Sequence, residues 1–141
     1  MRYILDTCVV FSALRSRRGA SHLVVQQALA GRLPLVMHFK LLAQYRDVLT
    51  RPEYRAHLIY TPAQIERVIA ALVGVAEEVN VRFLWRPNLL DEGDNFVVEI
   101  AVAAQPCTIV THNVRDFHAG ELRFPAVFIK RPQEIIQQGR T

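Results

Sequence analysis

The fold of this chain is indicated most clearly by residues 108–117, which read Thr108-Ile109-Val110-Thr111-His112-Asn113-Val114-Arg115-Asp116-Phe117. The first four residues form a β-branched run, which is typical of a buried strand. Polar residues follow at once, and Asp116 lies among them. In a parallel α/β sheet, ligands bind outside the carboxyl ends of the strands, so the residues after Thr111 are candidates for a site.

Outward from this stretch, strand patterns alternate with helix patterns. Further strands are expected at residues 2–5, 33–37, 81–83 and 126–129. Helices are expected at residues 20–30, 41–51, 62–79 and 132–138, and from Asp94 onward. This alternation predicts an α/β fold with a mostly parallel sheet. Because no linker, repeat or low-complexity segment interrupts the pattern, residues 1–141 are expected to form one domain.

Composition sets broad limits on the class of protein. Of the 141 residues, 51% are apolar and 21% charged, which indicates a globular rather than a disordered chain. The net charge of +4 suits a nucleic-acid partner but also suits many unrelated proteins. No apolar run approaches the roughly eighteen residues of a membrane span, and Asp6 comes too early for a signal peptide. Only two cysteines occur, without metal or redox spacing, so a cytoplasmic protein is expected.

Three acids are placed at the same edge of the expected sheet. Asp6 closes the first strand, Asp94 begins the helix before strand 108–111, and Asp116 follows that strand. Their mutual repulsion would be costly unless a cation lay between them. Oxygen ligands without a Cys or His pattern favour Mg²⁺ or Mn²⁺, which can activate water for attack on a phosphodiester.

A structural role for the same acids has equal weight on spacing alone. Asp94 would then be a helix N-cap, Asp116 a turn residue, and Asp6 a cap for the segment that follows it. The spacing does not decide between a metal site and these three structural roles.

The segment Leu5-Asp6-Thr7-Cys8-Val9-Val10-Phe11-Ser12-Ala13-Leu14 resembles the first motif of PIN-domain proteins. It is closest to the branch of toxin components of bacterial toxin–antitoxin systems. Residues 19–21, 45–53, 86–89 and 109–117 match the same branch in the same order. The resemblance therefore covers nearly the whole chain.

This resemblance implies a PIN-like fold, a twisted, mostly parallel sheet flanked by helices, with an acidic pocket at one edge. It implies a divalent-metal-dependent endoribonuclease and a separate antitoxin chain that covers the site. The catalytic and metal-binding residues would be Asp6, Asp94 and Asp116. Asn113 and the Thr111 hydroxyl would complete the pocket.

Two positions depart from the family pattern. Gln44 stands where the family usually has Glu; an amide keeps an acceptor oxygen but loses a charge, so metal affinity should fall. The alternative function is therefore a catalytically impaired PIN-fold module that binds RNA or regulates. Cys8 stands where many members have Asn, and is expected to be a small core residue. A third alternative, phosphoryl transfer through Asp6, lacks the expected Asp-x-Asp pattern.

Several other residues are candidates for contacts rather than for catalysis. Arg15, Arg17, Arg18 and Arg115 are expected to contact RNA phosphates. His112 is expected to face outward or to touch substrate. Glu99, five residues past Asp94, is expected to have a surface or structural role. The apolar Leu23/Val24 and Tyr45/Leu49 helix faces are expected in the core, with a homodimer interface as the alternative.

Overall fold

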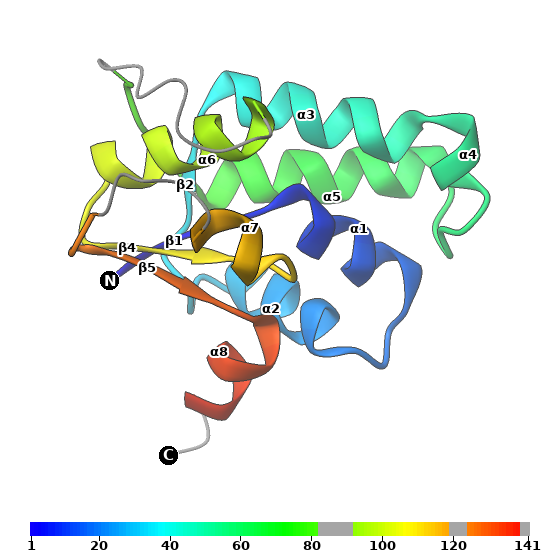
Figure 1. Ribbon diagram of the computed structural model, residues 1–141. Helices are drawn as coiled ribbons and strands as arrows, with labels where there is room; N and C mark the ends of the chain where they lie inside the picture. Colours follow the sequence, from blue (N-terminus) through cyan, green and yellow to red (C-terminus); the bar gives the residue numbers. More distant parts are fainter. Residues whose placement is uncertain (82–91, 119–123, 139–141) are drawn as a thin grey trace.

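The computed structural model describes residues 1–81, 92–118 and 124–138; for residues 92–95 it describes the backbone only. Strands and helices alternate along the chain, as the sequence pattern indicates (Figure 1). In chain order the elements are β1 (Arg2–Leu5), α1 (Thr7–Arg15), α2 (Ala20–Leu29), β2 (Val36–Met37), α3 (Phe39–Thr50), α4 (Pro52–Arg55), α5 (Pro62–Val75), β3 (Glu77–Glu78), α6 (Glu92–Ala103), β4 (Cys107–Val110), α7 (Val114–His118), β5 (Val127–Lys130) and α8 (Pro132–Gln138).

All strand pairs in the described residues are parallel, which confirms the α/β prediction. One sheet has the order β1-β4-β5, and β2 pairs with β3 beside it. A single bridge between Tyr3 and Leu35 links the two sheets. Because Leu5 pairs with Val110, which pairs with Lys130, the carboxyl ends of three strands are level with one another. Residues that follow these strands are thereby brought together.

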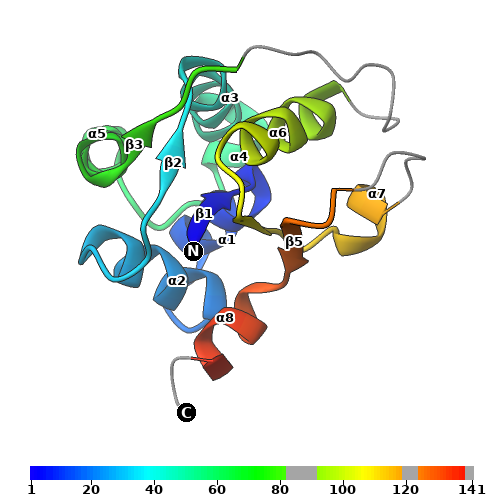
Figure 2. The same cartoon turned by 90° about the vertical axis from the view of Figure 1, so that its left-hand side faces the viewer.

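Helices cover both faces of the sheets. Two views agree that α3, α5 and α6 lie on one side of β1, and that α2 and α8 lie on the other (Figures 1 and 2). The buried core between them includes Ile4, Val24, Leu49 and Ile109. Leu23 is 39% exposed, so its expected place in the core is wrong, although the other three residues of the two helix faces are buried. Leu23 and Val24 are consecutive in α2, so their side chains point in different directions around the helix, and only Val24 faces the core.

Helix α1 is the main element that the sequence patterns did not predict. Val9, Val10, Ala13 and Leu14 are buried on one side of it, at helical spacing. The β-branched residues Val9 and Val10 near its start are typical of strands, so in the sequence they look like a continuation of the first strand and not like a helix. The Asp6 side chain caps it by accepting a hydrogen bond from the Thr7 backbone N–H.

The third strand lies earlier than expected. Helix α5 begins with a capping box of Thr61 and Gln64 but ends at Val75, not near residue 79 as the sequence pattern predicts. Strand β3 then occupies residues 77–78, and of the predicted strand at 81–83 only Val81 is described, outside any strand. The Glu77 N–H donates to the Leu35 carbonyl at 2.8 Å. Backbone pairing with β2 thus overrides the low strand propensity of two glutamates.

Other boundaries shift by a few residues. The strand expected at 33–37 is limited to β2 and the bridge at Leu35, and the short helix α4 begins at Pro52, where the sequence predicted only a helix end. Proline suits this first helical position. Residues 86–89, which carry part of the family resemblance, lie outside the described residues, and α6 begins at Glu92, two residues before Asp94. Among the described helices none has the length and apolar character of a membrane span.

Candidate active site

Asp6 lies at the junction of β1 and α1, where the parallel pairing of β1 with β4 places it beside the end of β4. Its side chain is only 6% exposed. Oδ1 accepts a hydrogen bond from the Thr7 backbone N–H at 2.9 Å, and Oδ2 accepts one from the Thr111 hydroxyl at 2.7 Å. The Asp6 N–H donates to the Val110 carbonyl at 3.0 Å, which extends the ladder to this residue. Sequence and structure therefore agree on Asp6 and Thr111 as neighbours.

The Thr111 hydroxyl also organises the turn after β4. It is fully buried and, while donating to Asp6, accepts from the Asn113 backbone N–H at 3.0 Å. The Asp116 N–H donates to the Asn113 carbonyl at 3.0 Å, so Asp116 lies in the first turn of α7 rather than in a loop. The side chains of Asn113 and Asp116 are both exposed. One hydroxyl thus couples the first predicted acid to the segment that carries the last.

Gln44 reaches the same place from α3. Its Oε1 accepts a hydrogen bond from the Thr7 hydroxyl at 2.9 Å. The predicted position of Gln44 beside the site is confirmed, but its contact is with Thr7 and not with the Asp6 carboxylate. We refer to Asp6, Thr7, Cys8, Gln44 and Thr111 together as the Asp6 cluster.

Cys8 belongs to this cluster and is also partly buried against the core, so its expected place as a small core residue is confirmed in part. Its Sγ lies 3.4 Å from Asp6 Oδ2 and 3.6 Å from the Thr111 Oγ1. Burial, and then the negative charge of Asp6, raise the pKa of the Cys8 thiol to about 12. The protonated thiol can therefore donate to Asp6, and it is not a reactive thiolate. Recognition of α1 in the sequence would have placed Cys8 in its first turn, beside the capping acid.

Asp94 lies in the first turn of α6, as the sequence predicts. Its side chain is outside the described residues, so its place in the site stays a prediction. Helix α6 packs on β4 and contacts both β1 and α7, the elements that carry the other two acids. The described residues alone contain no cluster of three His, Cys, Asp or Glu side chains suited to a metal ion.

His112 contacts α2 from the turn after β4. Its Nε2 lies 2.8 Å from the Oγ of Ser21, which is buried in the first turn of α2. Burial lowers the pKa of the His112 imidazole, while the negative charge of Asp6 acts in the opposite direction. No sequence pattern pointed to Ser21 as the partner, since it lies 91 residues away.

The four arginines expected to contact RNA are all exposed. Arg15, Arg17 and Arg18 lie at and beyond the end of α1, and Arg115 lies in α7 next to Asp116. Of these, only Arg115 is close in sequence to a member of the predicted acidic set. Arg17 instead contacts the Tyr60 ring.

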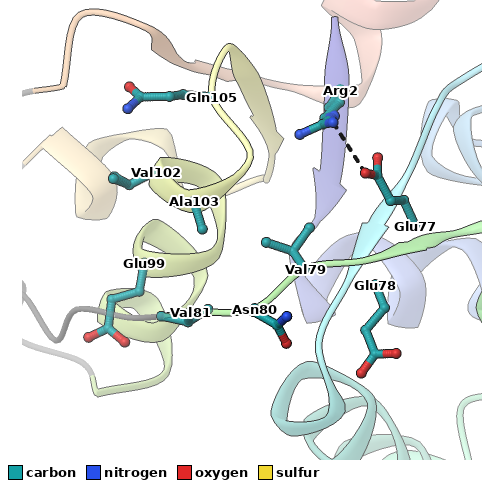
Figure 3. Close-up of a pocket in the computed structure, with 10 residues that line it drawn as sticks. All are labelled: Arg2, Glu77, Glu78, Val79, Asn80, Val81, Glu99, Val102, Ala103 and Gln105. Carbon is teal, nitrogen blue, oxygen red and sulfur yellow. Dashed lines mark hydrogen bonds and ion pairs between the residues drawn. The ribbon is translucent and has the colours of Figure 1, made fainter.

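A separate pocket of about 570 Å³ lies near Arg2, at the other end of β1 from Asp6 (Figure 3). Arg2 pairs with Glu77 there at 3.2 Å, and Glu99 also lines the pocket. Glu99 is only 1% exposed, so the surface role considered for it is wrong and the structural role remains. This pocket includes none of the predicted catalytic residues.

The donor set around Asp6 fits a hard divalent cation. The ion pairs described in the structure lie elsewhere, and no basic side chain among the described residues pairs with Asp6. Hydrogen bonds from Thr7 and Thr111 offset part of the cost of burying this carboxylate, and a bound cation would offset its charge further. The side-chain oxygens of Thr111, Asn113 and Asp116 are the type of donor that Mg²⁺ and Mn²⁺ prefer.

Comparisons with known proteins agree with this geometry. A family model described as a PIN domain matches residues 2–115. No curated protein matches the sequence. Among solved structures, the chain is similar to one chain in the crystal structure of VapBC2 from Rickettsia felis bound to a DNA fragment from their promoter. The TM-score is 0.60 at 14% identity, and the match covers 93% of this chain and 98% of that one. At this identity the likeness shows a common fold.

Proposed function

The chain belongs to the PIN-domain family, and from this premise we propose that it is a divalent-metal-dependent endoribonuclease, the toxin component of a toxin–antitoxin pair. PIN domains are generally nucleases, and we propose RNA as the substrate of this one and a divalent metal ion as its cofactor.

The observation that carries the proposal is the environment of Asp6. Its carboxylate is buried at the carboxyl edge of the sheet and is held in place by hydrogen bonds at both oxygens. Such a carboxylate is already oriented before a ligand arrives. A cation would offset its charge, since no basic side chain in the described part of the chain pairs with it.

Each proposed ligand has a separate role. Asp6 would bind the ion from the end of β1, Asp94 from the start of α6 and Asp116 from α7. Mg²⁺ or Mn²⁺, when bound, supplies Lewis acidity and lowers the pKa of a bound water. The Thr111 hydroxyl keeps Asp6 and the Asn113 turn in register. Arg115, exposed beside Asp116, would contact a phosphate of the RNA.

The test is Mn²⁺-dependent cleavage of a mixed RNA by the wild type and by Asp6→Asn. We expect cleavage by the wild type and a loss of about a hundredfold or more in the variant, because the lost carboxylate would hold the metal ion that stabilises the charge of the transition state. Glu66→Gln, which removes an exposed carboxylate on α5, is the matched control and should cleave normally. Equal rates for wild type and Asp6→Asn would end the nuclease proposal.

A second function is favoured by Gln44. The neutral amide accepts from Thr7 where the family pattern predicts a carboxylate, so the site has one charge fewer. An RNA-binding or regulatory module would bind RNA without cutting it. Wild-type protein that binds RNA in Mn²⁺ but leaves it intact would support this function in place of the first.

The proposed partner is a separate antitoxin chain, since the solved structure with the similar fold is of a VapBC2 complex. Co-expression with the product of the neighbouring reading frame tests this. Co-purification of the two chains, with inhibition of RNA cleavage, is the expected result. A neighbouring product that neither binds nor inhibits would contradict the assignment.

A further inference from the structure

The end of α1 lies beside the segment that includes α4 (Figure 1), and together the two segments carry exposed basic and aromatic side chains. We call this the arginine–tyrosine surface, and it consists of Arg15, Arg17, Arg18, Tyr54, Arg55 and Tyr60. Its arginines are exposed, and its two tyrosines are partly exposed. Two segments distant in sequence, 15–18 and 51–60, form it.

The two segments are held together by backbone and ring contacts. The Ile59 N–H donates to the Leu14 carbonyl at 3.1 Å, which fixes the segment after α4 against the end of α1. The Phe11 and Tyr54 rings meet edge to face with centroids 5.5 Å apart. The surface is therefore built by the fold and does not depend on the chance positions of long side chains.

Two arginine–tyrosine pairs are in contact, one on this surface and one beside it. The Arg17 guanidinium lies 5.4 Å from the Tyr60 ring centroid, and its Nε donates to the Tyr60 hydroxyl at 3.5 Å. Arg51, just beside the surface, lies 5.8 Å from the Tyr54 ring centroid. Guanidinium planes and aromatic rings are the two kinds of group on which unpaired bases stack.

The charge of the surface is strongly positive. Its two segments contain the arginines Arg15, Arg17, Arg18, Arg51 and Arg55, with Glu53 as their single acid. Asp47 on α3 pairs with Arg51. Arg15, Arg18 and Arg55 have no ion-pair partner within the described parts of the chain. Their charges remain available to phosphates.

The surface also has a fixed relation to the candidate active site. Helix α1 begins next to Asp6 and ends at Arg15. At about 1.5 Å per residue, its nine residues span roughly 14 Å. A polynucleotide with one phosphate at Asp6 can therefore reach the surface within a few nucleotides.

We infer that the arginine–tyrosine surface binds a single-stranded segment of the RNA substrate, a few nucleotides away from the phosphodiester at Asp6. This inference rests on the proposed function. A double helix presents its bases stacked and paired, so it can use the arginines but not the tyrosine rings. An acidic protein segment would likewise bind through the charges of the arginines and would not need the tyrosine rings.

The test is equilibrium binding of a short labelled polyuridine RNA in EDTA, where a metal-dependent nuclease leaves it uncut. The double variant Arg17→Gln/Arg18→Gln should bind about tenfold more weakly. The slope of log K against log salt should fall by about 1.4, which corresponds to two lost phosphate contacts on a single strand. The matched control is Arg32→Gln/Arg67→Gln, which removes the same charge from exposed positions elsewhere and should stay within about twofold of the wild type.

A second pair of variants tests the ring. Tyr60→Phe keeps the ring and loses only the hydroxyl that accepts from Arg17, so it should weaken binding much less than Tyr60→Leu, which should weaken it about tenfold. A duplex RNA of equal length should bind both variants equally. Thermal unfolding of each variant establishes that it is folded under the assay conditions.

Three results would overturn the inference: no binding by the wild type, equal losses in the double variant and its control, or equal affinity of the Tyr60→Phe and Tyr60→Leu proteins. Cleavage in Mn²⁺ is measured alongside. Cleavage by the wild type together with unaffected binding in the arginine variants removes this inference and leaves the nuclease. Arginine-dependent binding without cleavage removes the nuclease and leaves the surface.

Discussion

Asp6 has a structural role as well as its proposed catalytic one, and the two can be separated by substitution. As the cap of α1 it accepts from Thr7, and Asn can replace Asp in that role. We expect Asp6→Asn to keep the metal-free unfolding free energy within about 1 kcal/mol of the wild type, because it also removes a buried charge. Asp6→Ala should lose about 2 kcal/mol through the lost cap and the unpaired Thr111 hydroxyl.

Urea denaturation in EDTA, followed by circular dichroism, measures both values. If Asp6→Asn were as unstable as Asp6→Ala, the carboxylate charge would be essential to the fold. Loss of cleavage in Asp6→Asn would then have a structural cause. A stable, inactive Asp6→Asn separates the two roles.

Gln44 is the residue where sequence and family pattern disagree most. The Gln44 side-chain oxygen accepts a hydrogen bond from Thr7, the residue next to Asp6. A glutamate at position 44 can keep this contact and add a negative charge close to Asp6. We expect Gln44→Glu to lower the Mn²⁺ concentration for half-maximal cleavage about tenfold, because ligand charge sets divalent-ion affinity. Titration of cleavage rate against Mn²⁺ measures it. An unchanged half-maximal concentration would show that Asp6, Asp94 and Asp116 suffice.

Helix α3 is capped by a titratable side chain. The His38 Nδ1 accepts from the Lys40 backbone N–H at 3.2 Å, and this requires the neutral ring. Burial and then Lys40 lower the His38 pKa, while Glu78 and Glu99 oppose the shift. A folded-state pKa below the unfolded value means that the unfolded chain binds more protons. The contribution of His38 to stability is therefore present above pH 6.5, the ordinary pKa of a histidine, and is lost as the pH falls toward the lower pKa of the folded state.

His38→Asn tests this, because Asn caps a helix without titrating in the same range. Midpoints of urea unfolding between pH 7 and about pH 5 should fall less steeply in the variant than in the wild type. Parallel pH profiles for the two proteins would assign the acid sensitivity to other groups.

The same helix is tied to β1 by Tyr45, whose hydroxyl donates to the Leu5 carbonyl. Tyr45 is only 1% exposed, so removal of its hydroxyl leaves a buried acceptor without this donor. Tyr45→Phe should lower the unfolding free energy by about 1–2 kcal/mol. Tyr54→Phe, on the exposed side of α4, should change it by less than about 0.5 kcal/mol in the same urea experiment. Equal effects would mean that the Tyr45 contact does not stabilise the junction of α3 with β1.

Across the whole molecule, sequence patterns predicted those features that depend on periodicity. Parallel pairing follows from alternating strands and helices, and it alone brings Asp6 beside Thr111. Features that depend on contacts between distant segments were missed. Ser21 is such a case, because its partner His112 lies 91 residues away and the contact leaves no period or spacing in the sequence. Cys8 was missed for a different reason: helix α1, which places it beside Asp6, was not recognised in the sequence.

The final prediction concerns the stability of the whole chain, because metal binding to the folded state alone must stabilise it. At a Mn²⁺ concentration a hundredfold above the dissociation constant, the unfolding free energy should rise by about 2.7 kcal/mol, or roughly 5–10 °C in Tm. Asp6→Asn in the same titration should show a much smaller rise, since its buried carboxylate is gone. Thermal unfolding measures this without any reliance on cleavage. An equal rise in both proteins would mean that the ion binds away from Asp6, and the buried carboxylate would then need another explanation.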